Sequence, residues 1–303
     1  MNQSIRLQLN ETPSRLSLYR RALFAKDLKG ETKLPTTRIT LANVKANIKK
    51  VTQYRDVCGF KHDNNQLPVT FPHVLAFPLH LELMLSKDFP FALMGMVHTR
   101  NEISQHRAIN AFESMDVSCF FDTIRTTPKG YEVDIKTEIH ITGELVWESI
   151  STNLAPRKTN IATTAESHNK PETKDLPYKE FWNLSSDLGR RYALISGDAN
   201  PIHLFSLSAK VFGFQGHIAH GMWTKARVVA ALYHKLNSES CKIVVDFKLP
   251  IFLPATIQLT YQPDELLTSK PKQSDKRIDF EIKDKAGVKP HMKGVIQSLS
   301  QIT

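Results

Sequence analysis

The order of hydrophobic and polar residues along the chain predicts one set of elements twice. Met222, Ala226 and Val229 recur at helical spacing, whereas polar and apolar residues alternate in YEVDIKTEIHI, as in a half-buried strand. Helices are expected over residues 41–54, 73–86, 180–196 and 220–236. Strands are expected over residues 91–103, 114–126, 130–140 and 143–151, and again over 242–252, 255–263, 277–285 and 291–300.

A polar, proline-containing segment without periodicity separates the two sets. It covers residues 153–177 and predicts a linker between a first unit over residues 1–152 and a second unit over 178–303. In each unit, helices precede several antiparallel strands. This order predicts an α+β fold in which each sheet wraps a helix.

Short alignments indicate that the units are copies of each other. YRDVCGF (54–60) aligns with YALISGD (192–198), which places Phe60 at the position of Asp198. HVLAFPL (73–79) aligns with HIAHGMW (217–223), and this pairs Phe77 with Gly221. Further on, VHTRNEI aligns with VDFKLPI. The second copy therefore carries extra residues between Gly197 and Gly221.

Composition excludes several classes of protein. With 303 residues, 41% of them hydrophobic and 23% charged, the chain is neither disordered nor of low complexity. Its strongly apolar stretches, such as residues 89–97, are too short to cross a bilayer. Cys58, Cys119 and Cys241 lie far apart and form no CxxC pair, which argues against disulfides and a cysteine zinc site. A cytoplasmic location is expected, and a mitochondrial leader is the weaker alternative.

Positive charge is concentrated near the N-terminus. The chain has a net charge of +10, and residues 1–61 hold thirteen Lys and Arg against four acidic residues. Such a segment attracts polyanions, including nucleic acid, anionic lipid, an acidic carrier protein or a phosphorylated cofactor. No nucleic-acid-binding motif accompanies it, so we expect a solvated basic face and no nucleic-acid partner.

The segment GDANPIH, residues 197–203, carries the sharpest chemical signal. Gly197 permits a sharp turn, and Asn200 followed by Pro201 stiffens the loop. A stiff loop can bring Asp198 and His203 to one water molecule for general acid–base catalysis. The alternative is a turn in which Asp198 and Asn200 bond backbone amides and His203 has no chemical role.

Further along the chain, AHGM opens the helix predicted over residues 220–236. Gly221 in its first turn lets a ligand approach unpaired backbone N–H groups, which suits a thioester oxygen that gains negative charge. Close packing of the helix is the alternative explanation for this glycine. His220 is interpreted first as a structural or supporting residue.

Taken together, GDANPIH, AHGM and FKLPIF (247–252) resemble the MaoC-like (R)-specific enoyl-CoA hydratase and dehydratase family. The resemblance covers roughly residues 178–300. It implies a double hotdog fold and interconversion of trans-2-enoyl and (R)-3-hydroxyacyl thioesters of coenzyme A or acyl carrier protein. It further implies that Asp198 and His203 are catalytic and that the Gly221 amide is the oxyanion donor. No metal and no cofactor beyond the substrate's own carrier is implied.

The first unit resembles a degenerate hotdog, because Phe60 and Phe77 replace the acid and the glycine. We expect it to have no catalytic pair and to shape the acyl pocket. In the second unit, Val229 stands where some family members carry a small polar residue. Lys248 and Arg227 are candidates for binding the carrier's phosphates.

Three alternatives remain open at this stage. The chain could be a hotdog acyl-CoA thioesterase, a non-catalytic acyl-thioester binder or a nucleic-acid binder. Because two hotdogs in one chain can pair internally, a monomer and a homodimer are both compatible with the sequence.

Overall fold

The computed structural model describes residues 5–28, 32–62, 65–161, 176–263 and 276–299. Their strands form one 11-stranded sheet in the order β1-β2-β4-β5-β6-β3-β8-β11-β10-β9-β7. The strands of the first half are β1 (Arg6–Leu9), β2 (Arg38–Lys45), β3 (Val97–Gln105), β4 (Ser114–Thr127), β5 (Gly130–Ile141) and β6 (Glu144–Pro156). Those of the second half are β7 (Tyr178–Leu184), β8 (Cys241–Phe247), β9 (Ala255–Pro263), β10 (Arg277–Asp284) and β11 (Pro290–Ser298).

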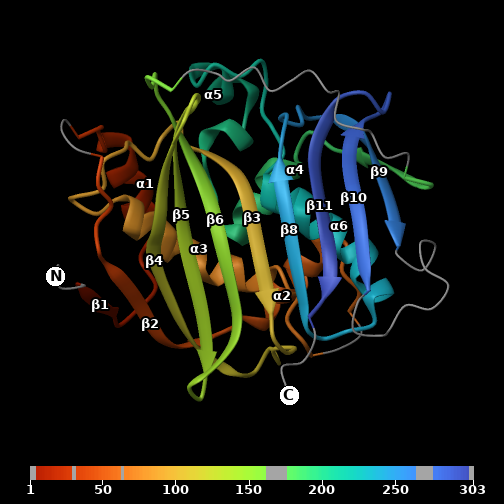
Figure 1. Ribbon diagram of the computed structural model, residues 1–303, viewed down its shortest axis with the longest axis horizontal. Helices are drawn as coiled ribbons and strands as arrows, with labels where there is room; N and C mark the ends of the chain where they lie inside the picture. Colours follow the sequence, from red (N-terminus) through yellow and green to blue (C-terminus); the bar gives the residue numbers. More distant parts are fainter. Residues whose placement is uncertain (1–4, 29–31, 63–64, 162–175, 264–275, 300–303) are drawn as a thin grey trace.

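Helices pack against the concave side of this sheet, with the longest two in the middle (Figure 1). They are α1 (Arg15–Phe24), α2 (Ile48–Cys58), α3 (Phe71–Met84), α4 (Leu188–Ser196), η1 (Pro201–His203), α5 (Ser206–Val211) and α6 (Gly221–Leu236). Among the described residues, no helix is both long enough and apolar enough to cross a membrane.

The two halves repeat one topology. Outward from the centre of the sheet, the first half runs β3-β6-β5-β4-β2 and the second half runs β8-β11-β10-β9-β7. Each of these ten strands thus has a counterpart of the same rank in chain order, whereas β1, which pairs with β2, has none. α3 and α6 are the long helices wrapped by the two half-sheets. The double hotdog expected from the sequence is confirmed.

The halves meet where β3 pairs with β8 in the sheet and where α2 packs against α4. β3 and β8 are antiparallel, with Ile103 opposite Ile243. On the helix side, the rings of Tyr54 on α2 and Tyr192 on α4 lie 6.1 Å apart. Both helices end at a glycine with positive φ, 79° at Gly59 and 86° at Gly197. The alignment of residues 54–60 with 192–198 therefore pairs equivalent helix ends.

Several predicted boundaries were wrong. Residues 41–45 belong to β2, and α2 begins only at Ile48, after the side chain of Asn47 accepts a hydrogen bond from Lys50 N. The helix predicted over residues 180–196 is a strand, β7, followed by α4. β8 ends at Phe247, so the segment VDFKLPI lies largely beyond the strand and its alignment was shifted.

Two further corrections concern the linker and the first unit. β6 continues to Pro156, so the linker predicted from residue 153 begins later, and residues 162–175 lie outside the described part of the chain. α3 begins at Phe71 as α6 begins at Gly221, so Phe71 and not Phe77 is the counterpart of Gly221 by helix position. The extra residues in the second copy form η1 and α5.

Candidate active site

The segment between α4 and η1 is a tightly bonded loop. Gly197 ends α4 with φ of 86°, a left-handed conformation that glycine adopts without steric cost. Asp198 N donates to Ser196 Oγ at 3.1 Å, and Asn200 N donates to Asp198 Oδ1 at 3.2 Å. Asn200 then caps η1, where Pro201 is the first residue and His203 the last. These contacts build the stiff turn expected from GDANPIH.

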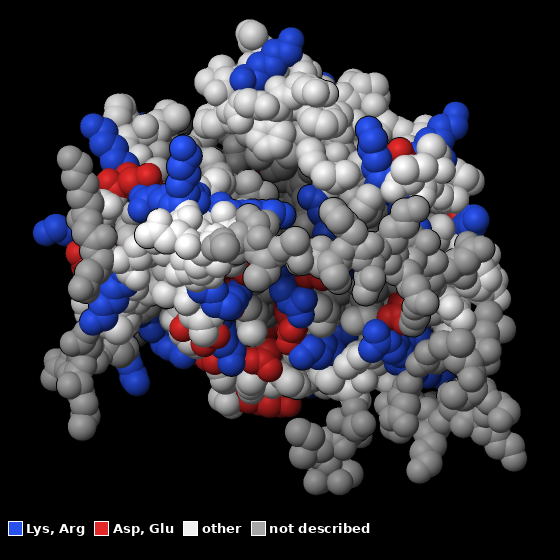
Figure 2. All heavy atoms as spheres, turned by 45° about the horizontal axis from the view of Figure 1, so that its top comes forward, with Lys and Arg blue, Asp and Glu red and all other residues white. Residues whose placement is uncertain are grey.

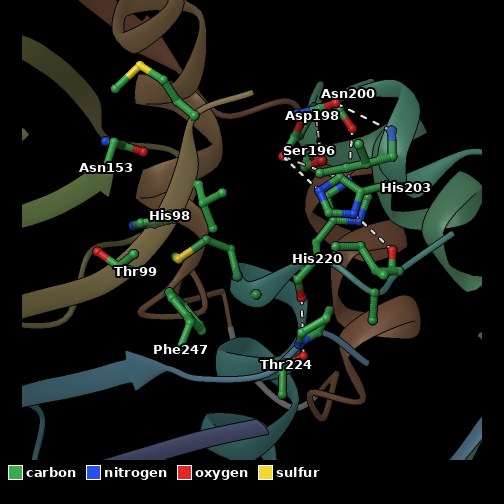
Figure 3. A pocket seen from close by; sticks show the side chains of 18 of the residues that line it. His98, Thr99, Asn153, Ser196, Asp198, Asn200, His203, His220, Thr224 and Phe247 are labelled. Atoms are coloured by element: carbon green, nitrogen blue, oxygen red, sulfur yellow. Dashed lines mark hydrogen bonds and ion pairs between the residues drawn. The ribbon is translucent and has the colours of Figure 1, made fainter. Parts of the chain in front are cut away.

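This turn brings the predicted acid and imidazole together, as Figure 3 shows. His203 Nε2 lies 4.0 Å from Asp198 Oδ2. His203 Nδ1 lies 2.9 Å from the carbonyl oxygen of Ile218, so this nitrogen carries the proton and Nε2 is left as an acceptor. A gap of 4.0 Å is too long for a direct hydrogen bond and suits one water molecule bonded to both groups.

Burial and neighbouring charges set the protonation states of the pair. Burial raises the pKa of Asp198, but the imidazoles of His220 and His203 and the hydrogen bond from Asn200 outweigh it, so the pKa lies below its usual value. Burial lowers the pKa of His203 despite the nearby Asp198 carboxylate. At neutral pH the site therefore holds a carboxylate and a neutral imidazole, both of which accept protons.

His220 supports this pair more closely than the sequence indicated. Its ring stacks on that of His203 with centroids 3.7 Å apart, and its Nε2 donates to the Asp198 carbonyl oxygen at 2.9 Å. Burial lowers the pKa of His220 to about 3, so it remains neutral. It also caps α6 and thereby connects the catalytic loop to the start of that helix.

Gly221 is the first residue of α6, where backbone N–H groups have no partner within the helix. A Cβ at this position would lie 2.9 Å from Phe247 Cε1, so the Phe247 ring occupies the place of a side chain. The glycine therefore packs closely against Phe247, and it also lies at the cavity wall without a side chain of its own.

A cavity of about 320 Å³ joins these residues. Asp198, Asn200, His203, Gly221 and Lys248 all line it, while Gly197 and Pro201 shape the loop behind. The opposite side comes from the first half of the chain, where His98, Thr99 and Asn153 face the catalytic loop across the cavity (Figure 3). Apolar side chains of α3, of the segment before β3 and of the start of β3 complete this side: Val74, Phe77, Leu81, Met84, Leu93, Met94, Met96 and Val97.

The remaining predicted residues lie in different surroundings. Arg227 is not among the residues that line the cavity. Its guanidinium packs against Gly59 and lies 4.6 Å from the Trp182 ring centroid, so it fills space between the halves. Val229 is fully buried in the core, and Phe60 packs on Tyr54 with ring centroids 6.1 Å apart.

A metal ion would have to compete with existing hydrogen bonds. Asp198, His203 and His220 offer ligand atoms within 4.8 Å of one another. However, His203 Nδ1 and His220 Nε2 already bond to backbone carbonyl groups. The bonded nitrogens leave Asp198 and His203 facing each other across a gap for water, which favours acid–base chemistry.

Sequence reasoning missed several residues of the site. Tyr19 lines the cavity from α1, and His73 and His98 line it from α3 and β3. The Nδ1 atom of His73 and the Nε2 atom of His98 are buried without a hydrogen-bond partner among the described residues. No local motif marks these side chains, because only the fold brings them next to the second half.

Comparisons with known proteins agree with this geometry. A family model described as MaoC like domain matches residues 163–286. The 3-hydroxyacyl-thioester dehydratase X of Mycobacterium tuberculosis is 30% identical over 266 residues, which cover 88% of this chain and 91% of that protein. A crystal structure of HtdX from the same organism has a TM-score of 0.72 at 28% identity, with 86% of this chain and 100% of that chain covered.

More distant structures share the fold. A MaoC-like dehydratase from Phytophthora capsici has a TM-score of 0.68 at 16% identity, with 89% of this chain and 97% of that chain covered. A Mycobacterium tuberculosis protein described as a double hotdog has a TM-score of 0.53 at 9% identity, with 84% and 93% covered.

Fold and site together define an enzyme of the hydratase and dehydratase class, built on a double hotdog. Within that class, the chain belongs to the MaoC-like dehydratase family.

Proposed function

We propose that this enzyme interconverts trans-2-enoyl thioesters and (R)-3-hydroxyacyl thioesters, with Asp198 and His203 as the acid–base pair. The observation that carries the proposal is the 4.0 Å gap between Asp198 Oδ2 and His203 Nε2 at the wall of a largely apolar cavity. The thioester dehydratase from Mycobacterium tuberculosis supports the same substrate class.

In the hydration direction, a water molecule bonded to both groups attacks C3 of the enoyl thioester. Its oxygen forms the new C–O bond, the C2–C3 π electrons move onto the thioester oxygen, and His203 Nε2 takes the proton. The same proton then passes to C2 as the enolate collapses. Because one side of the cavity supplies both the hydroxyl group and the proton, the addition is syn. Dehydration follows these steps in reverse.

The enolate oxygen needs a hydrogen-bond donor that is already in place. The amide of Gly221 is suited to this role because it lies at the positive end of a 16-residue helix and has no intrahelical acceptor. No side chain at Gly221 stands between that amide and the cavity.

Each half of the chain would bind a different part of the substrate, the first half the acyl chain and the second half its carrier. Apolar residues of the first half, such as Phe77, Met84 and Met96, would surround the acyl chain. At the other end, a second hollow shares Leu249, Pro250 and His291 with the cavity and adds Lys289. Lys248 and Lys289 would there contact the phosphates of coenzyme A or the acidic surface of an acyl carrier protein.

This chemistry requires no metal or redox cofactor beyond the carrier that belongs to the substrate. We further propose the domain roles that the sequence predicted: a non-catalytic first hotdog and a catalytic second hotdog, joined by the linker. Cys58, Cys119 and Cys241 are free and buried, which fits the reducing conditions of the cytoplasm.

The test is enoyl-thioester hydration, measured as the loss of absorbance of crotonyl-CoA and of longer 2-enoyl-CoA esters. Asp198→Asn and His203→Gln are expected to lower kcat by about 10²–10⁴-fold each, because each removes one proton acceptor from the shared water. Asp122→Asn, exposed on β4, and His106→Gln, exposed just after β3, are the matched controls and should retain wild-type rates.

Product analysis separates the alternatives. The (R)-3-hydroxyacyl product is expected, and no free thiol should appear. Thiol release from saturated acyl-CoA would show a thioesterase, and near-wild-type hydration by both catalytic variants would refute the acid–base assignment. Tight binding of enoyl thioesters without turnover would indicate a binding protein.

A further inference from the structure

Helix α1 lies in the basic N-terminal segment, before the region matched by the family model, and yet it reaches the catalytic loop. Arg15 Nη1 donates to the carbonyl oxygen of Leu194 at 3.1 Å, and its guanidinium covers Gly197 at the end of α4. One turn further along α1, Tyr19 lines the cavity beside Asp198. The first half of the chain therefore contributes directly to the acid–base centre.

We propose that Tyr19 is a positioning residue that holds the Asp198 carboxylate in its working orientation. The inference rests on the function proposed above, because it assigns Tyr19 to the same reaction. Tyr19 itself touches the loop and not the reacting atoms, so it acts through Asp198.

Hydrogen-bond geometry shows how the hydroxyl group would do this. It accepts a bond from Ala199 N at 2.6 Å, and its single proton has two acceptors within reach, Gly197 O at 3.3 Å and Asp198 Oδ1 at 3.4 Å. Asp198 Oδ1 also accepts from Asn200 N. With Oδ1 engaged from two sides, the other oxygen, Oδ2, is left facing His203.

The hydroxyl group stays protonated throughout the working range of the enzyme. Burial raises the pKa of Tyr19 above its usual value, and the nearby Asp198 carboxylate raises it further. Tyr19 is therefore a hydrogen-bond donor whenever Asp198 is ionised. Donation to the carboxylate favours its charged form and lowers the pKa of Asp198.

Other groups around Asp198 act on the same titration and stay constant when only Tyr19 is changed. They are His203 on η1, His220 at the start of α6, the backbone amide of Asn200, Tyr192 on α4 and His98 on β3, while Arg15 on α1 acts on Tyr19 itself. Loss of the Tyr19 hydroxyl should thus raise the pKa of Asp198 while these neighbours remain.

The experiment compares Tyr19→Phe with wild type and with Leu16→Ala. Leu16 lies on the same helix and is 75% exposed, so its replacement tests loosening of α1 without touching the loop. Tyr19→Phe is expected to lower kcat about tenfold, with KM changed less than about twofold. The acid limb of the kcat profile should move up by about half a pH unit, because Asp198 must be ionised to accept a hydrogen bond from the reacting water.

A second readout does not depend on turnover. The pKa of Asp198 can be measured by NMR of ¹³C-labelled aspartate, with the signal identified by its loss in Asp198→Asn. It should rise in Tyr19→Phe and stay unchanged in Leu16→Ala.

Each outcome decides one hypothesis. Wild-type kcat and an unmoved acid limb in Tyr19→Phe would overturn the role of Tyr19, as would an equal loss in Leu16→Ala. Inactivity of the wild type on every enoyl thioester would instead refute the proposed function, and the NMR titration would still decide whether Tyr19 controls Asp198.

Discussion

At the scale of single residues, Gly221 combines a structural and a chemical requirement. Its Cα faces the Phe247 ring so closely that an added methyl group would lie 2.9 Å from Cε1 and 3.0 Å from Cδ1. The same residue presents the backbone amide at the start of α6. Any side chain therefore displaces either the ring, which lines the cavity, or the amide.

Gly221→Ala is expected to lower kcat by about 10²-fold, because a misplaced oxyanion donor no longer stabilises the enolate. Gly216→Ala is the matched control, since a Cβ there meets only ordinary contacts at 3.7 Å or more. Replacing Phe247 by Leu in the Gly221→Ala background should restore part of the rate. Hydration kinetics of the three variants check this, and a wild-type rate in Gly221→Ala would show that the added methyl group does not displace the amide.

The side chains that the structure brings together as the sequence indicated are near each other in the chain. Asp198 and His203 are five positions apart, so one rigid turn suffices to place them together. Tyr19 lies 180 positions from Ala199, to which it bonds, and the sequence could not reveal this contact. Arg227 lies over Trp182 and outside the cavity lining, a placement that the sequence could not reveal because only the fold supplies this partner.

At the scale of elements, the junction between β3 and β8 contains a buried lysine. Lys225 on α6 has no solvent exposure, and its Nζ donates to Asn101 Oδ1 at 2.6 Å and to the carbonyl oxygen of Ile243 at 3.1 Å. Burial moves the pKa of Lys225 well below its usual value. One side chain of the catalytic half thus binds both strands at the point where the half-sheets join.

This depressed pKa makes stability depend on pH. Between the folded pKa and the unfolded value near 10.4, only the unfolded chain binds this proton, so the free energy of unfolding rises with pH. Between pH 8 and 10, the free energy of unfolding of the wild type, measured by urea titration, should rise by about 1 kcal/mol per pH unit more than that of Lys225→Met. Lys242→Met, on β8 with its side chain 34% exposed, is the control and should follow wild type. If the free energies of unfolding of wild type and Lys225→Met change with pH in the same way, Lys225 is charged in the folded protein.

Element boundaries were the least predictable feature of the chain. The hydrophobic residues of RITLANVK fit both the helical period of 3.6 residues and the strand period of 2 residues. The segment forms strand β2 because it pairs with β4. Likewise, Tyr178–Leu184 is a strand because β9 offers it a partner along its whole length. Long-range pairing decided both cases, and no local pattern encodes it.

At the scale of the whole molecule, the repeat was visible in the sequence because both halves keep the same order of elements. The pairing of β3 with β8, which makes the sheet continuous, could not be predicted from the sequence, because strand order within a sheet is decided by the fold. That sheet places the first half beside the loop of Asp198 and His203, so that it forms one wall of the cavity. The sequence indicated this division of roles, and the cavity lining supports it.

The overall charge leads to a prediction about substrate capture. Lys and Arg side chains are spread over the face shown in Figure 2, and the chain carries a net charge of +10. Such a field attracts the phosphates of coenzyme A, and salt screens it within a Debye length of about 10 Å at 0.1 M. KM for crotonyl-CoA should rise about threefold to tenfold between 25 and 300 mM NaCl, with kcat unchanged.

The matched substrate is the N-acetylcysteamine thioester of crotonate, which has the same reacting atoms and no phosphate, so its KM should hardly change. Lys248→Ala and Lys289→Ala should each reduce the salt dependence for crotonyl-CoA alone. An equal response of both thioesters to salt would show that the basic surface does not guide the substrate, and the charge would then have to serve another partner.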